Sequence, residues 1–192
     1  MFEGIASGVL LVCLSISAYY RYRARMESGT IPRRSESRSL VVMRLFGTLP
    51  LGAAIVAHLA NPGWMAWASF PSPEWVRWSG VILGFLTVPV VYWVFVSLDR
   101  NVSETVLTKQ EHHLVTKGPY AWVRHPLYST GFALLLSIGL MTASWLILAF
   151  TAGAFLMIRF LIVPLEEKQL LLKFGDDYRA MMSRTGRFLP GM

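Results

Sequence analysis

Long apolar stretches alternate with short polar ones along the chain. Three stretches, residues 2–20, 40–60 and 75–98, each supply about the 20 mainly apolar residues that a membrane-spanning helix needs. A fourth, residues 127–163, is too long for one crossing and is interrupted only by the small polar segment 142–144. We expect this stretch to be a helical hairpin that crosses twice, so the pattern predicts five transmembrane helices.

The composition supports a membrane protein. Hydrophobic residues make up 54% of the 192 residues, which is more than an ordinary soluble protein carries, and the length suits one domain. We therefore predict an all-α integral membrane protein with a single membrane-embedded domain, residues 1–192. Residues 1–98 provide three N-terminal spans, and residues 99–192 provide the C-terminal helical hairpin and a tail helix.

The basic residues indicate how the spans are oriented. The segment 61–75 contains no Lys or Arg, whereas arginines are frequent between the first two spans. These arginines are Arg21, Arg23, Arg25, Arg33, Arg34, Arg38 and Arg44. By the positive-inside rule this segment is cytosolic and the N-terminus lies outside, in what we expect to be the cell inner membrane. Glu3, with no basic residue before the first apolar core, predicts a retained anchor and not a cleaved signal peptide.

Charge and cysteine content exclude several function classes. The net charge of +7 follows the membrane edge, so topology and anionic membrane lipids account for it without a nucleic-acid partner. Cys13 is the only cysteine and lies in an apolar span, which excludes disulfides and thiolate-rich metal sites. We predict no metal. The sequence makes no prediction about the oligomeric state.

Polar residues gather in two segments that the topology places on the cytosolic face, 99–128 and the region from Glu166 onward. In the second segment Leu170, Phe174, Tyr178 and Met181 recur at helical spacing. This stripe predicts an amphipathic cytosolic tail helix along the membrane surface, with Gly175 as a candidate break. Such a helix would cover a pocket whose floor is the polar segment before the hairpin.

Residues 112–128 concentrate three histidines, an arginine and two tyrosines at the start of a span. Several residues of this segment also have a structural explanation. Arg124 would reach the headgroups, Pro126 would occupy a first helical turn, and the tyrosines would form an interfacial belt. Glu166 and Glu167 follow an apolar run, and both suit the negative first turn of a helix. For Glu167 we favour that structural interpretation. His58 lies inside the second span, where an ionisable side chain is costly, and we favour a structural role near the outer interface.

Two sequence blocks carry a family resemblance. LVTKGPYAWVRHPLY, residues 114–128, is followed about forty residues later by EEKQLLLKFGDDY, residues 166–178. Together they resemble the isoprenylcysteine carboxyl methyltransferase family, within a superfamily of membrane methyltransferases that includes phospholipid methyltransferases. The resemblance covers the C-terminal half. It implies an enzyme that uses S-adenosyl-L-methionine (SAM) to methylate a lipophilic acceptor at the cytosolic membrane face, with residues 99–192 as the cofactor-binding half.

The resemblance also implies a cofactor pocket without a Rossmann domain, and no G-x-G-x-x-G motif occurs in the chain. By motif position, one group of residues would line the adenosine and ribose side: His112, Leu114, Val115 and Tyr120, with Gly118 in the same pocket. A second group would hold the methionine portion: His125, Pro126 and Tyr128. Arg124 would pair with the cofactor carboxylate, and Glu166 would approach its amino acid end.

One position departs from the family pattern. The family commonly has an arginine four residues before the glutamate, near the substrate carboxylate, and here Ile162 stands there. Arg159 is the nearest arginine and would take over if the helix is shifted or kinked, which Pro164 would permit. The catalytic candidates are therefore Glu166, Arg159 and Arg124.

Three functions remain open from the sequence. The first is O-methylation of an isoprenylcysteine carboxyl group, with a prenylated cysteine or another lipophilic small molecule as acceptor. The second is phospholipid N-methylation on the same scaffold. The third is a non-catalytic membrane protein in which the motifs serve packing and lipid anchoring. A carboxylate acceptor is already ionised at neutral pH and needs no base, whereas an amine or hydroxyl would need one, from His112, His125 or Glu166.

Overall fold

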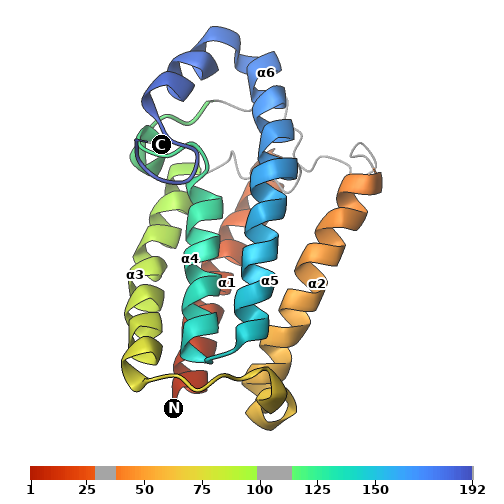
Figure 1. Ribbon diagram of the computed structural model, residues 1–192. Helices are drawn as coiled ribbons and strands as arrows, with labels where there is room; N and C mark the ends of the chain where they lie inside the picture. Colours follow the sequence, from red (N-terminus) through yellow and green to blue (C-terminus); the bar gives the residue numbers. More distant parts are fainter. Residues whose placement is uncertain (29–37, 99–113, 192) are drawn as a thin grey trace.

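The computed structural model describes residues 1–28, 38–98 and 114–191. Its α-helices are α1 (Phe2–Ser28), α2 (Arg38–Ala60), α3 (Glu74–Leu98), α4 (Pro126–Met141), α5 (Trp145–Met157) and α6 (Val163–Arg184). Three shorter helices are the 3₁₀-helices η2 (Pro62–Ala68) and η4 (Gly118–Ala121) and the π-helix η5 (Ile158–Ile162). The described residues form only isolated β-bridges and no strand, which confirms the predicted all-α class. Helices α1 to α5 run side by side, with the N-terminus at the end away from α6 (Figure 1).

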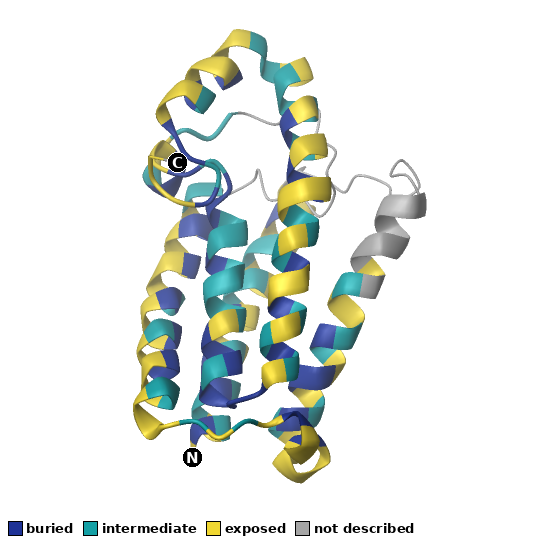
Figure 2. Cartoon of the chain, in the orientation of Figure 1, coloured by how far each residue is buried: buried dark blue, intermediate teal, exposed yellow. Residues whose placement is uncertain are grey.

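The helices lie where the apolar stretches predicted them. α1, α3 and the run from Trp145 to Arg184 are long and apolar enough to cross a membrane, and α4 and the Gly47–Ala60 part of α2 are shorter apolar helices. The number of crossings stays a prediction. Buried residues face the inside of the bundle and exposed ones face outward (Figure 2). Many of the exposed side chains are large and apolar, such as Phe85, Leu86 and Leu156, as expected for a lipid-facing surface.

The tail helix differs from the prediction at its start. It is not a separate helix, because α5 continues through η5 into α6 without a break in helical hydrogen bonding. The π-turn at Ile158–Ile162 ends two positions before Pro164. Proline lacks an N–H, and its ring would clash with the carbonyl four residues back in a regular α-helix. A wider turn avoids that clash.

The length of this helical run indicates where Glu166 and Glu167 lie relative to the membrane. The run extends from Trp145 to Arg184, and its part before the break at Gly175 is about 45 Å long at 1.5 Å per residue, which exceeds the roughly 30 Å of a bilayer's hydrocarbon core. The apolar part, from Trp145 to Leu165, is about 30 Å long and fills one crossing. Glu166 and Glu167 therefore come just beyond the membrane-spanning part.

At the end of the bundle that carries the N-terminus, one arginine joins three helices. Arg77 of α3 donates from Nε to the Met141 carbonyl of α4 at 2.7 Å and from Nη2 to Glu3 of α1 at 2.8 Å. Its guanidinium carbon lies 4.1 Å from the ring centroid of Phe2. His58, for which the sequence favours a structural role, is only 2% exposed, and its Nδ1 atom has no hydrogen-bond partner. We call this end the loop end.

At the opposite end, α6 turns back over the bundle. Gly175 has φ 51° and ψ −119°, a conformation that favours glycine, and it confirms the predicted break. The helix after Gly175 leads the chain back toward the start of α4 (Figure 1). We call this the site end, and it carries residues 114–128 and 163–191.

Candidate functional site

His125 lies where the polar segment enters α4. Its backbone leaves the helical region (φ −122°, ψ 57°) and Pro126 begins the helix, so the imidazole sits at the helix N-terminus. The His125 N–H donates to the Arg187 carbonyl at 3.0 Å, which fixes the residue against the C-terminal segment. The side chain is buried, and the Tyr128 ring lies beside it at 5.8 Å between centroids.

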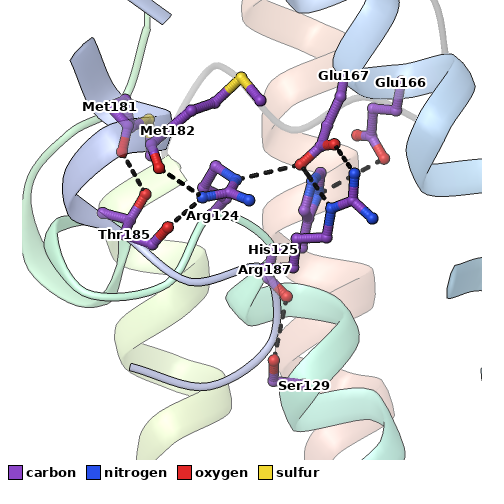
Figure 3. A network of polar contacts seen from close by, with 9 residues as sticks. All are labelled: Arg124, His125, Ser129, Glu166, Glu167, Met181, Met182, Thr185 and Arg187. Atoms are coloured by element: carbon purple, nitrogen blue, oxygen red, sulfur yellow. Dashed lines mark hydrogen bonds and ion pairs between the residues drawn. The ribbon is translucent and has the colours of Figure 1, made fainter. Parts of the chain in front are cut away.

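The two glutamates of α6 flank the His125 imidazole (Figure 3). Nδ1 lies 3.8 Å from Glu166 Oε2, and Nε2 lies 3.5 Å from Glu167 Oε1. These distances are those of charge neighbours more than of well-formed hydrogen bonds. The structure thus brings together His125 and Glu166, which the resemblance placed at the same end of the cofactor.

Glu167 is the centre of this network, a more extensive role than the helix-start position that the sequence favours for it. Arg124 donates from Nε to its Oε1 at 3.1 Å, and Arg187 donates from Nη2 to its Oε2 at 2.7 Å. Burial alone would raise the pKa of Glu167, but the contacts from His125, Arg187 and Arg124 outweigh it and lower the pKa to about 2. Glu167 is therefore a buried carboxylate held ionised by two guanidinium groups.

The C-terminal residues 185–188 form a strap across the start of α4. The Arg124 N–H donates to the Gly186 carbonyl at 2.8 Å, and Ser129 Oγ donates to the Phe188 carbonyl at 2.7 Å. Arg124 Nη1 also donates to the carbonyls of Met182 and Thr185 (Figure 3). Neither the role of Arg187 nor the strap is predictable from the sequence, because no periodic pattern marks this segment.

Three buried polar atoms at the site end have no hydrogen-bond partner: His125 Nε2, Glu166 Oε2 and the Tyr178 hydroxyl. Buried polar atoms are nearly always satisfied in folded proteins, so an unpaired group needs an explanation. Three of them in one region indicate a place where a polar ligand would supply the missing partners.

An apolar wall lies next to these atoms. Val94 of α3, Tyr120 of η4, and Tyr178 and Met181 of α6 form one buried cluster, and Leu114 and Val115 pack against it. Burial, with a smaller contribution from the charge of Glu166, raises the pKa of Tyr120 well above its ordinary value, so its phenol is neutral. Gly118, at φ +61°, lets the chain approach α3 closely, since a Cβ there would lie 2.4 Å from Ser97 Oγ. The predicted adenosine-side residues that the structure describes therefore gather on one wall.

Two predicted residues lie elsewhere. Arg159 is exposed, and its guanidinium carbon sits 5.5 Å from the ring centroid of Phe160. Ile162, at the position where the family commonly has an arginine, is only 2% exposed. His112 lies outside the described residues.

The comparisons with known proteins fit this arrangement. The family model for phospholipid methyltransferases matches residues 75–177, from the start of α3 to the residue before Tyr178. The chain belongs to the phospholipid methyltransferase family. The predicted membrane methyltransferase superfamily is confirmed.

Three curated relatives of this family member show how much of each chain the sequence similarity covers. The nickel-cobalt-cadmium resistance protein NccN of Alcaligenes xylosoxydans xylosoxydans is 36% identical over 43% of the chain and 38% of its own length. Methanethiol S-methyltransferase 1 of Bradyrhizobium diazoefficiens is 27% identical over 65% of the chain and 48% of its length. The cobalt-zinc-cadmium resistance protein CzcN of Cupriavidus metallidurans is 33% identical over 43% of the chain and 38% of its length. The chain thus spans less than half the length of these relatives.

A solved structure supports the fold of this family member along nearly all of the chain. The eukaryotic intramembrane isoprenylcysteine carboxyl methyltransferase superposes with a TM-score of 0.58 at 18% identity, over 97% of this chain and 68% of that one. The long apolar helices and this likeness identify an integral membrane protein.

Proposed function

We propose that this protein transfers a methyl group from SAM to a lipophilic acceptor at the cytosolic membrane face, most like the O-methylation of an isoprenylcysteine carboxyl group. The observation that carries the proposal is the buried Oε2 of Glu166 at the site end, which has no hydrogen bond and only the His125 imidazole beside it, at 3.8 Å. The family and the fold support methyl transfer as the reaction class.

The charges of the site suit this cofactor. Glu167 is neutralised by Arg124 and Arg187, so the ligand-facing negative charge comes from Glu166. A buried carboxylate oxygen without a hydrogen bond is unfavourable, and the cationic ammonium group of a methionine derivative would relieve that cost. The nucleoside half would lie on the wall of Leu114, Val115 and Tyr120, and the Tyr120 and Tyr128 rings are the candidates for attracting the sulfonium, at about 0.5–2 kcal/mol.

The residues of this chain mainly align and enclose the reactants. When bound, the cofactor supplies a sulfonium methyl group that a nucleophile takes by direct displacement, so the protein must orient both and exclude water. His125 and Glu166 would hold the amino acid end from two sides. The strap of residues 185–188 covers His125 and keeps that end of the site shielded from water.

A second candidate reaction, phospholipid N-methylation, differs from the first in the molecule that accepts the methyl group. The match to the phospholipid methyltransferase model favours it, and so does the buried Ile162 in place of an arginine for an acceptor carboxylate. A catalytic role of Arg159 in binding the acceptor stays a prediction. The product separates the two reactions, because a methyl ester from a prenylcysteine analogue is base-labile and a methylated phosphatidylethanolamine is base-stable.

Calorimetry of the purified protein in detergent with SAM tests the proposal. We expect wild-type protein to bind, and Glu166→Gln to bind about 10- to 100-fold more weakly, the range expected for losing a hydrogen bond to a charged group. Asp177→Asn is the matched control, because it removes a charge from an exposed position of the same helix and should bind like wild type. Wild-type protein that gives no signal at millimolar SAM would contradict the proposal.

A further inference from the structure

Tyr178 has an environment that the fold does not explain. It lies in α6 three residues after the Gly175 break and is 1% exposed, with its ring packed among Val94, Tyr120 and Met181. Its hydroxyl is buried and has no hydrogen-bond partner. A phenylalanine would fill the same space without burying a polar atom, so packing accounts for the ring but not for the hydroxyl.

The hydroxyl keeps its proton and is available as a donor. Burial, and to a lesser degree the negative charge of Glu167, raises the pKa of Tyr178 above its ordinary value. A neutral phenol both donates and accepts a hydrogen bond. Because a buried donor without a partner is unfavourable, a ligand that brings an acceptor to this position gains affinity.

The surroundings of Tyr178 indicate which part of a ligand it meets. The ring belongs to the apolar wall with Tyr120, where Leu114 and Val115 also pack. The hydroxyl lies at the border between this wall and the charged network, because the charges of Glu167 and Arg124 act on it. The charged network suits the ammonium and carboxylate of an amino acid, and the apolar wall suits a flat heterocycle. A hydroxyl between the two suits the sugar that joins them.

We propose that the Tyr178 hydroxyl is a binding group for the nucleoside half of the methyl donor, to which it donates a hydrogen bond. This inference rests on the proposed function, because it assumes that a SAM-type ligand occupies the site. On this proposal, the part of α6 after Gly175 contacts the ligand directly and also covers the pocket.

The test compares Tyr178→Phe with wild type, using two ligands that need no catalytic turnover. S-adenosylhomocysteine contains both halves, and methylthioadenosine lacks the amino acid half. Calorimetry should show that Tyr178→Phe binds both ligands about 3- to 10-fold more weakly, the size of one net hydrogen bond. Thermal unfolding of the ligand-free variant should be unchanged or shifted upward, since the lost hydroxyl has no partner in the fold. Tyr22→Phe, at an exposed position, is the matched control and should leave both affinities unchanged.

Each other outcome has a defined meaning. A loss of affinity for S-adenosylhomocysteine alone would overturn the inference, because the hydroxyl would then serve the amino acid half. Unchanged affinity for both ligands would also overturn it, as would wild-type protein that binds S-adenosylhomocysteine but not methylthioadenosine. If wild type binds neither S-adenosylhomocysteine nor SAM, the proposed function itself fails, which is distinguishable from the other results.

Discussion

Glu166 and Glu167 are neighbours in the chain with opposite environments. Glu167 accepts hydrogen bonds from Arg124 and Arg187, whereas Glu166 keeps one buried oxygen without a hydrogen bond. One carboxylate therefore stabilises the fold and the other remains available to a ligand. Substituting the two glutamates should separate stability from binding.

Glu167 should make stability depend on pH in the acidic range. Its folded pKa of about 2 lies below the ordinary 4.5, so its contribution is complete above pH 4.5 and is lost as the pH falls toward 2. Between pH 6 and pH 3 this amounts to about 2 kcal/mol of unfolding free energy. We expect Glu167→Gln to be less stable than wild type at pH 6, with a difference about 2 kcal/mol smaller at pH 3.

Chemical denaturation in detergent at the two pH values measures this difference. Asp177→Asn should show the same pH dependence as wild type, because that side chain is exposed. A stability difference between wild type and Glu167→Gln that stays constant from pH 6 to pH 3 would contradict the assigned role of Glu167.

At this scale, the sequence predicted which residues lie together only where a motif implied a partner. His125 and Glu166 come from the two family blocks, and the structure places them together. Glu167 was assigned a helix-start role because its arginine partners lie 43 and 20 positions away in the chain. Arg187 reaches it through the strap, whose path after Arg184 is not helical and leaves no periodic signal. Tyr178 was recognised only as part of an apolar stripe.

At the scale of the elements, the break at Gly175 positions everything that follows it. A Cβ at Gly175 would meet no atom within 4 Å, so Gly175→Ala tests the backbone conformation alone. A positive φ costs a residue with a Cβ about 1–2 kcal/mol, and we expect lower thermal stability and weaker binding of S-adenosylhomocysteine. Thermal unfolding and calorimetry measure the two effects.

Gly153→Ala in α5 is the control for this variant, because a Cβ there also meets no atom but the backbone is helical. That substitution should be neutral or stabilising, by up to about 1 kcal/mol. Equal behaviour of the two variants would show that the break at Gly175 does not position the tail.

The pattern of apolar and polar residues predicted where the helices lie, but it did not predict how α5 joins α6. Pro164 indicated a kink, and the structure resolves it as a π-turn that keeps the helix continuous, because one widened turn is enough to accommodate a missing N–H. A window of hydrophobicity cannot distinguish a widened turn from a helix end, since both leave the apolar pattern in place.

At the scale of the whole molecule, the charge pattern predicts which end faces the cytosol. Basic residues of the described chain, such as Arg23, Arg179 and Arg184, lie at the site end, whereas Arg77 at the loop end is paired with Glu3. The orientation can be tested with single cysteines, because the only native cysteine, Cys13, is buried and replaceable by alanine.

We expect an impermeant maleimide to label Ala66→Cys, in η2 at the loop end, in intact cells. It should label Ser183→Cys, at the end of α6, only after permeabilisation. Both variants carry Cys13→Ala, and both positions are exposed. The reverse labelling pattern would contradict the orientation that the positive-inside rule predicts.

The class of the molecule was predictable because four long apolar stretches leave few alternatives to a membrane protein. The family was predictable because the two motif blocks occur in order. The acceptor was not, since its binding depends on a lipid-facing surface in which many apolar side chains are equivalent. Ile162 illustrates this point: its burial is clear, but burial alone does not select an acceptor.

The continuous helix from Trp145 to Gly175 has a mechanical consequence. The helical hydrogen bonds continue through the π-turn and Pro164, so we expect a tilt of the lipid-facing half of this helix to be passed on to its aqueous half. Hydrophobic mismatch with a thinner or thicker bilayer changes that tilt. We therefore expect the spacing between the α6 carboxylates and the start of α4 to depend on acyl-chain length.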